Sequence, residues 1–232
     1  MHNEMIFIAQ TTFVVLAGIF FSSRSTGWLT GWITTLSVIM NVFVLKQIVL
    51  CNLEITSADV YMIGLLSCLN FSREIYGQNK VNEAMVGSWI ITIAFLLLTQ
   101  LHLALKPSPT DSSQSHFIAL FSPTLRLTFA SLITLIIVQI VDLKLFSYLK
   151  HLFQNKAFGT RSAVSLVSSQ ILDTLLFSFL GLYGIVSNLS HVILFSLITK
   201  ICAIVMSVPI VVLGKYLKKQ KEAQSDKIRM DG

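Results

Sequence analysis

Seven apolar segments dominate this chain and constrain its fold more than any other feature. A helix needs about 20 predominantly apolar residues to cross the hydrocarbon core of a bilayer. The segments are long enough, and close enough together, to supply six or seven such spans with short connections. We therefore expect an all-α fold, a polytopic transmembrane helical bundle. The segments cover residues 5–21, 29–50, 55–71, 85–104, 123–149, 162–183 and 189–213.

Charged side chains are scarce and unevenly distributed. Lys, Arg, Asp and Glu make up 12% of the 232 residues, whereas a soluble domain usually contains about 25%. Six basic and three acidic residues fall after residue 213. We therefore expect a single transmembrane domain over residues 1–213 and a basic cytoplasmic tail over residues 214–232. Because no stretch of roughly 100 residues lacks membrane character, we expect no separate ATPase or soluble catalytic domain.

The distribution of Lys and Arg predicts the orientation, because these residues are retained on the cytoplasmic side. A tail on the inside also makes residues 22–28, 72–84 and 150–161 cytoplasmic. This pattern favours seven spans with the amino end outside, and it explains the net charge of +6 without direct nucleic-acid binding. The alternative is six spans, with the short third segment broken or re-entrant and the amino end inside. The inside connections contain Arg24, Arg73, Lys80, Lys150, Lys156 and Arg161, against Lys46 and Lys106 near the opposite face.

Ionisable side chains within a span are costly, which makes each one a candidate for function. Asp173 lies twelve residues after Arg161, near the bilayer centre at about 1.5 Å per residue. One interpretation is an ion pair with Lys200 that only joins two helices. The other is a polar cavity in which Asp173 binds substrate or a coupling proton. Asp173 shares one helical face with a row of serines, and Gln170 borders that face. This polar stripe favours the cavity. The stripe consists of Ser162, Ser165, Ser169 and Asp173.

The fifth segment repeats this polar pattern. Residues at steps of four, four and three share one helical face there, namely Ser131, Leu135, Gln139 and Asp142. Arg126 lies near the outer edge of the same segment, where a snorkelling side chain is the alternative to a binding role. Glu74 and Tyr76 close the third segment, and the alternative for them is an interfacial anchor. These side chains extend the set of candidate binding residues.

Motifs for other chemistries are absent from the sequence. The chain contains no Walker loop, HExxH, CxxC or G-x-S-x-G motif, and its five histidines lie near termini, span ends or loops. The minimum parts of a metal site or a nucleophilic enzyme are therefore missing. Cys51, Cys68 and Cys202 lie in or beside apolar segments, which argues against a disulfide framework. We expect a protein that is not an enzyme, with no catalytic residue, metal ion or cofactor.

Three motifs have specific spacing. The first is Glu74-x-Tyr76-Gly77, and the second runs from Arg126 through Gln139-x-x-Asp142 to Phe146. The third is Arg161-x-x-x-Ser165-x-x-x-Ser169-Gln170-x-x-Asp173-Thr174. Over about residues 55–185 these motifs resemble the core of the queuosine precursor transporter family, a group of vitamin-uptake-transporter-like integral membrane proteins. The sequence departs from that family at Asn70, Val81-Asn82 and Leu166.

The resemblance implies uptake of a 7-deazaguanine, a purine-like base used in queuosine modification of tRNA. It also implies a multi-pass protein of the cell inner membrane. A carboxylate could accept the paired N–H donors of a guanine edge, and Phe129, Phe146 or Phe177 could stack on the base. With the polar stripes, the resemblance gives a predicted substrate-binding set of Glu74, Tyr76, Arg126, Gln139, Asp142, Arg161, Ser169, Gln170 and Asp173.

Two alternatives to an autonomous transporter remain open. The chain could be a substrate-binding membrane subunit that needs a separate energising complex. It could also be a structural membrane protein whose buried charges only form ion pairs. Transport by the purified chain in liposomes separates the first alternative from an autonomous transporter.

We predict that the carboxyl tail and residues 150–161 face the cytoplasm, because the excess of Lys and Arg lies there. In a variant without its native cysteines, Lys156→Cys should react with a membrane-impermeant maleimide only after the cells are permeabilised. Lys106→Cys, the matched position near the opposite face, should react in intact cells. Labelling of Lys156→Cys in intact cells would overturn this topology.

Overall fold

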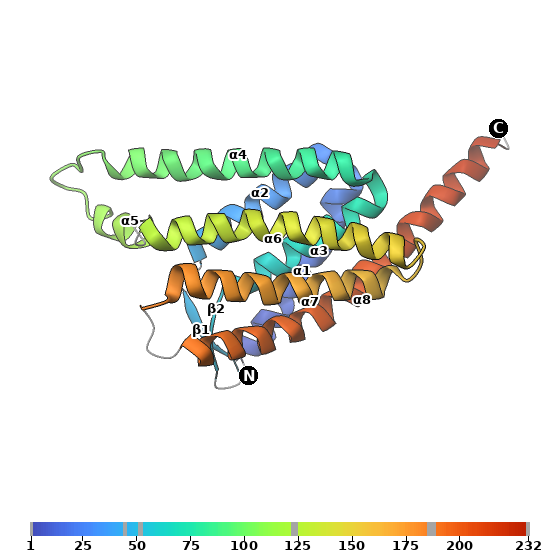
Figure 1. Ribbon diagram of the computed structural model, residues 1–232. Helices are drawn as coiled ribbons and strands as arrows, with labels where there is room; N and C mark the ends of the chain where they lie inside the picture. The colour runs from blue at the N-terminus through green and yellow to red at the C-terminus, as the bar shows by residue number, and fades with distance from the viewer. Residues whose placement is uncertain (1, 44–45, 51–52, 122–124, 185–188, 231–232) are drawn as a thin grey trace.

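Long α-helices make up almost all of the chain in the computed structural model, which describes residues 2–43, 46–50, 53–121, 125–184 and 189–230. The predicted all-α helical bundle is confirmed (Figure 1). The elements in order are α1 (His2–Arg24), α2 (Thr26–Phe43), β1 (Gln47–Leu50), β2 (Leu53–Thr56), α3 (Asp59–Tyr76), α4 (Gln78–Leu103), α5 (Gln114–Phe121), α6 (Leu125–Leu152), α7 (Phe158–Phe177), the π-helical turn η1 (Ser178–Leu182) and α8 (Leu189–Met230).

Five helical segments of the described chain are long and apolar enough to cross a membrane. They are His2–Arg24, Gln78–Leu103, Phe129–Leu152, Phe158–Leu182 and Val192–Lys218. The helices α2 and α3 lie outside this set, although each has 18 residues. At 1.5 Å per residue each is about 27 Å long, only slightly shorter than the roughly 30 Å hydrocarbon core. The choice between six and seven spans therefore depends on these two helices.

The predicted second segment, residues 29–50, is wrong at its carboxyl end. Residues 47–50 form strand β1, which pairs antiparallel with β2 so that Gln47 lies opposite Thr56. A short apolar run of Ile, Val and Leu is compatible with a strand as well as with a helix, because both bury apolar side chains. The suggestion that the third segment is broken is also wrong, since α3 is one unbroken helix.

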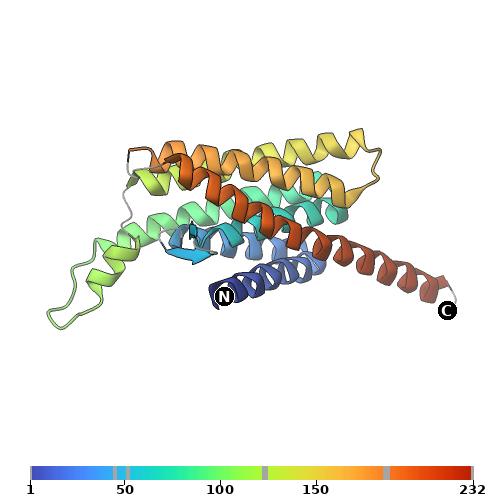
Figure 2. The same cartoon turned by 90° about the horizontal axis from the view of Figure 1, so that it is seen from below.

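The central helix of the bundle is α3. Every residue from Asp59 to Arg73 is buried, and α3 packs against α1, α2 and α8, with further contacts to α4, α6 and α7. Seen from below, α3 lies between α1 and the α6–α7 pair (Figure 2). A helix that is surrounded by other helices has no face for lipid, so its polar side chains must find partners inside the protein.

Two sharp reversals set the direction of the neighbouring helices. Gly77 alone separates α3 from α4, and its φ of 78° lies in the left-handed region that glycine tolerates best. A turn of five residues, 153–157, joins α6 to α7 and makes them an antiparallel pair. The first reversal folds α4 back from the end of α3, and the second sets α7 against α6. Contacts of α3 with both α6 and α7 then bring these three helices together.

The helix α8 crosses the predicted boundary between residues 213 and 214 without a break. Its last part projects beyond the bundle in both views (Figures 1 and 2). The cytoplasmic position of this basic tail stays a prediction.

We predict that Gly64→Ala destabilises the bundle, because α1 and α3 are in close contact there. A Cβ atom at Gly64 would lie 2.2 Å from Cγ1 of Val14, and overpacking of this kind costs about 1–3 kcal/mol. The control is Gly31→Ala, since a Cβ at Gly31 meets nothing within 4 Å. Thermal unfolding in detergent should show a lower Tm for Gly64→Ala alone, and Val14→Ala should restore part of it. Equal Tm values for the two glycine variants would contradict this packing.

Candidate functional site

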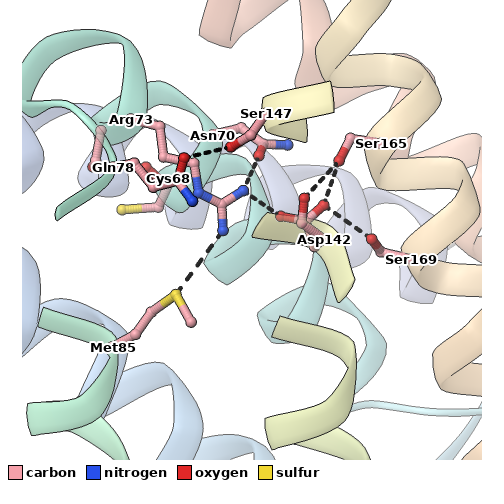
Figure 3. Close-up of polar contacts among 10 residues, drawn as sticks. Cys68, Asn70, Arg73, Gln78, Met85, Asp142, Ser147, Ser165 and Ser169 are labelled. Carbon is pink, nitrogen blue, oxygen red and sulfur yellow. Dashed lines mark hydrogen bonds and ion pairs between the residues drawn. The ribbon is translucent and has the colours of Figure 1, made fainter. Parts of the chain in front are cut away.

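A buried ion pair joins α3 to α6 in the interior of the bundle. Nη1 of Arg73 lies 2.6 Å from Oδ2 of Asp142, and the two side chains are 3% and 0% exposed. The other carboxylate oxygen, Oδ1, accepts hydrogen bonds from Ser165 and Ser169 of α7, at 2.6 Å and 2.9 Å (Figure 3). Asp142 therefore connects three helices, and its charge is balanced by the guanidinium group and both hydroxyl groups.

Arg73 also contacts its own helix and α4. Its Nη1 donates to Oδ1 of Asn70 at 2.8 Å, and its Nη2 lies 3.9 Å from the sulfur of Met85 (Figure 3). The expectation that Arg73 lies in a cytoplasmic connection is wrong, because α3 continues to Tyr76 and the guanidinium group turns into the bundle. The spacing of Asn70 and Arg73 by three residues was the available signal, since such residues share a helical face.

Three buried amide side chains carry hydrogen-bonding groups with no protein partner among the described residues. Oε1 of Gln139 accepts from the indole N–H of Trp89, which leaves Nε2 of Gln139 without a partner. Nδ2 of Asn70 and both polar atoms of Gln170 are also without one. Burying such groups is costly unless something hydrogen-bonds to them. Their free groups are therefore candidates for hydrogen bonds to a bound polar ligand or to water.

The antiparallel pairing of α6 and α7 explains why these amides lie near the ion pair. Asp142 lies opposite Ser165 and Ser169. Gln139 lies three residues before Asp142 on α6, and Gln170 directly follows Ser169 on α7. The predicted polar face of α6 is confirmed, since Ser131, Leu135, Gln139 and Asp142 are all buried. We define the central site as Asn70, Arg73, Trp89, Gln139, Asp142 and Gln170. Sequence reasoning missed three of these as site members, namely Asn70, Arg73 and Trp89.

Glu74 forms a second ionic network at the end of α3. Its carboxylate lies 2.8 Å from Arg161 of α7 and 2.9 Å from Lys215 of α8. Arg161 is fully buried, lies 5.3 Å from the centre of the Phe146 ring, and donates from Nε to the carbonyl oxygen of Lys156. Arg161 was expected in a connecting segment, but it belongs to α7. The structure thus brings the predicted residues Glu74 and Arg161 together, separately from Asp142.

Lys200 forms a third network with two carboxylates. Its Nζ lies 2.6 Å from Asp173 and 3.3 Å from Asp59, and it also donates to Thr174 at 3.1 Å. The interpretation of Asp173 as the partner of Lys200 therefore matches the structure, with Asp59 as an additional partner. Asp173 departs from the face of its serine stripe, because Ser165 and Ser169 contact α6 whereas Asp173 contacts α8. A substrate or proton role for Asp173 stays a prediction.

The two outer networks show that α3 and α8 run parallel. Asp59 and Glu74 of α3 pair with Lys200 and Lys215 of α8, and each pair of positions is 15 residues apart. Fifteen residues of helix correspond to about 22 Å. The helix α3 therefore accompanies α8 over most of a bilayer thickness, which favours seven spans over a re-entrant third segment.

The remaining candidates lie elsewhere. The Tyr76 hydroxyl donates to the carbonyl oxygen of Ser22 at 2.5 Å and so anchors α3 to α1. Phe129 is 60% exposed on the outside of the bundle, which leaves it no stacking role, whereas Phe146 is buried beside both arginines. The side chain of Arg126 lies outside the described residues. A pocket of about 630 Å³ opens between α1 and α2 beside Trp28 and Trp32, away from the central site.

We predict that Lys200→Met strongly destabilises the protein, because it leaves two carboxylates unbalanced. Removing one partner of a buried ion pair costs about 3–5 kcal/mol. Asp173→Asn should cost less, since Lys200 keeps Asp59, and the triple variant with Asp59→Asn, Asp173→Asn and Lys200→Met should recover most of the loss. Thermal unfolding in detergent measures these differences. A stable Asp173→Asn protein that has lost uptake would instead support substrate or proton binding by Asp173.

Comparison with known proteins agrees with the motifs. Residues 56–214 match the family model described as "Putative vitamin uptake transporter". The chain is also similar to the "Probable queuosine precursor transporter" of Bacillus subtilis (strain 168), with 26% identity over 226 residues that cover 95% of this chain and 97% of that protein. No solved structure matches. The chain is therefore a multi-pass membrane transporter that belongs to the vitamin uptake transporter family.

Proposed function

We propose that this chain imports a 7-deazaguanine base, a precursor of the queuosine modification of tRNA, across the cell inner membrane. The substrate class is supported by the name of the Bacillus subtilis relative, whose similarity extends over nearly the whole chain. The observation that carries the proposal is the central site itself, where three buried amides beside a neutral ion pair have unused hydrogen-bonding groups.

The chemistry of the central site suits a small, flat, polar molecule. A bare metal ion would require several oxygen ligands, yet the oxygens of Asn70, Gln139 and Asp142 already accept hydrogen bonds. A lipid tail would leave the amides without partners. A purine-like base offers donors and acceptors along its edges, and its face can lie against an aromatic ring such as the indole of Trp89.

The proposal treats the chain as the complete translocation unit. Uptake of the base into liposomes that contain only the purified chain would support this. Binding without uptake would instead indicate a subunit that depends on a separate energising complex.

The test of the substrate is complementation. In a bacterial strain that neither makes nor imports the precursor, expression of this chain should restore queuosine in tRNA when a 7-deazaguanine is supplied, and guanine should not. Queuosine is measured in digested tRNA by mass spectrometry. Absence of queuosine with every 7-deazaguanine, while the protein is present in the membrane, would contradict the proposal.

The variant Gln170→Met connects the central site to this activity. Because no described protein group bonds to the Gln170 amide, the change should leave the Tm equal or higher. Loss of one or two hydrogen bonds to the substrate, at about 0.5–1.5 kcal/mol each, should lower uptake by about tenfold. The matched control is Gln100→Met on the exposed part of α4, which should retain uptake. Normal uptake by Gln170→Met would remove this residue from the site.

A further inference from the structure

The central site carries no net charge. The guanidinium group of Arg73 and the carboxylate of Asp142 balance each other at 2.6 Å. Arg161, which lies at the same Phe146 ring as Arg73, is paired with Glu74 at 2.8 Å. That carboxylate also binds Lys215 at 2.9 Å. Asp142 accepts one bond from Arg73 and two from serine hydroxyls, so its carboxylate has little remaining capacity to accept hydrogen bonds from a ligand. The carboxylate of Asp142 is therefore not the group that binds the substrate in the central site.

The partners of two amides fix which of their atoms face the ligand. Arg73 and the indole of Trp89 can only donate hydrogen bonds, so the amide oxygens of Asn70 and Gln139 must point toward them. The NH₂ groups of Asn70 and Gln139 are consequently the atoms left over. The Nε of Arg73 is a further donor without a partner, and Gln170 offers one donor group and one acceptor. The unused groups are mostly donors.

We infer that this site selects a neutral base that presents hydrogen-bond acceptors, and that Asn70 sets this selectivity. The inference rests on the proposed function and specifies the substrate of the same site. A carbonyl oxygen, a ring nitrogen or a nitrile can accept from the NH₂ groups of Asn70 and Gln139. A cationic substituent would meet donors and the guanidinium group of Arg73, with no carboxylate available to balance it.

The charge at position 70 decides this preference. An aspartate there would still accept the hydrogen bond from Arg73, but it would replace the free donor by an acceptor and give the site a net negative charge. Asn70→Asp should therefore lower the affinity for a neutral base and raise the affinity for a cationic one. Gln139→Glu makes the same change from α6 while it keeps an acceptor for the N–H of Trp89.

The experiment measures binding of two 7-deazaguanines to the purified full chain in nanodiscs by calorimetry. The probes differ only at carbon 7, where one carries a neutral nitrile and the other an aminomethyl group that is protonated at neutral pH, as alkylamines are. For the unaltered chain, the nitrile should bind tighter by about a hundredfold, given the cost of an unbalanced charge within a membrane. In Asn70→Asp this ratio should fall by about tenfold or more, because the new carboxylate balances the cation.

Control variants separate the possible failures. Gln100→Glu places the same amide-to-acid change on an exposed position of α4 and should leave the ratio of affinities unchanged. If Asn70→Asp does not fold, Gln139→Glu provides the same comparison. Equal affinities of the unaltered chain for both probes, or an unchanged ratio in both acid variants, would overturn the inference and leave the proposed function standing. If neither probe binds, the proposed function fails and the inference fails with it.

Discussion

The buried ion pair between Arg73 and Asp142 is the interaction on which the arrangement of α3, α6 and α7 depends. An unpaired charge in the membrane interior costs from about 2.5 kcal/mol to more than 10 kcal/mol. Here each charge is balanced by the other at 2.6 Å. The hydroxyl groups of Ser165 and Ser169 donate hydrogen bonds to the second carboxylate oxygen of Asp142. Any displacement of one helix would separate the charges, so the three helices are held in one register.

The same constraint explains why α3 lies at the centre. This helix contains Asp59, Arg73 and Glu74, and each of them pairs with a charge on another helix. The network of Asp59 lies at the start of α3, and the networks of Arg73 and Glu74 lie near its end. A helix with this composition is stable inside a membrane only when other helices surround it. The polarity that excludes α3 from the apolar spans is therefore the reason for its burial.

Hydropathy and periodicity were sufficient to predict the helical bundle and the buried face of α6, because both depend only on residues near in sequence. The partners of the carboxylates could not be predicted this way. Arg73 and Asp142 are 69 residues apart, and their contact depends on how α3 packs against α6. Counting Lys and Arg as topology signals places Arg73 and Arg161 in connections, whereas the structure buries both in helices. The signals that pointed the other way were the spacing of Asn70 and Arg73 and the motif that begins at Arg161, and neither identifies the carboxylate that each arginine meets.

The charges and the amides of this protein are suited to different tasks for a physical reason. During a transport cycle the central site must be stable without substrate as well as with it. A charge without a partner would make the empty state too costly, so every described carboxylate of the three networks has a cation within 4 Å. A buried amide group without a partner costs only about 1–3 kcal/mol, which the folded bundle can sustain. Under the proposed function, binding of the substrate would offset this smaller cost, so that the amides provide affinity and selectivity while the ion pairs maintain the fold.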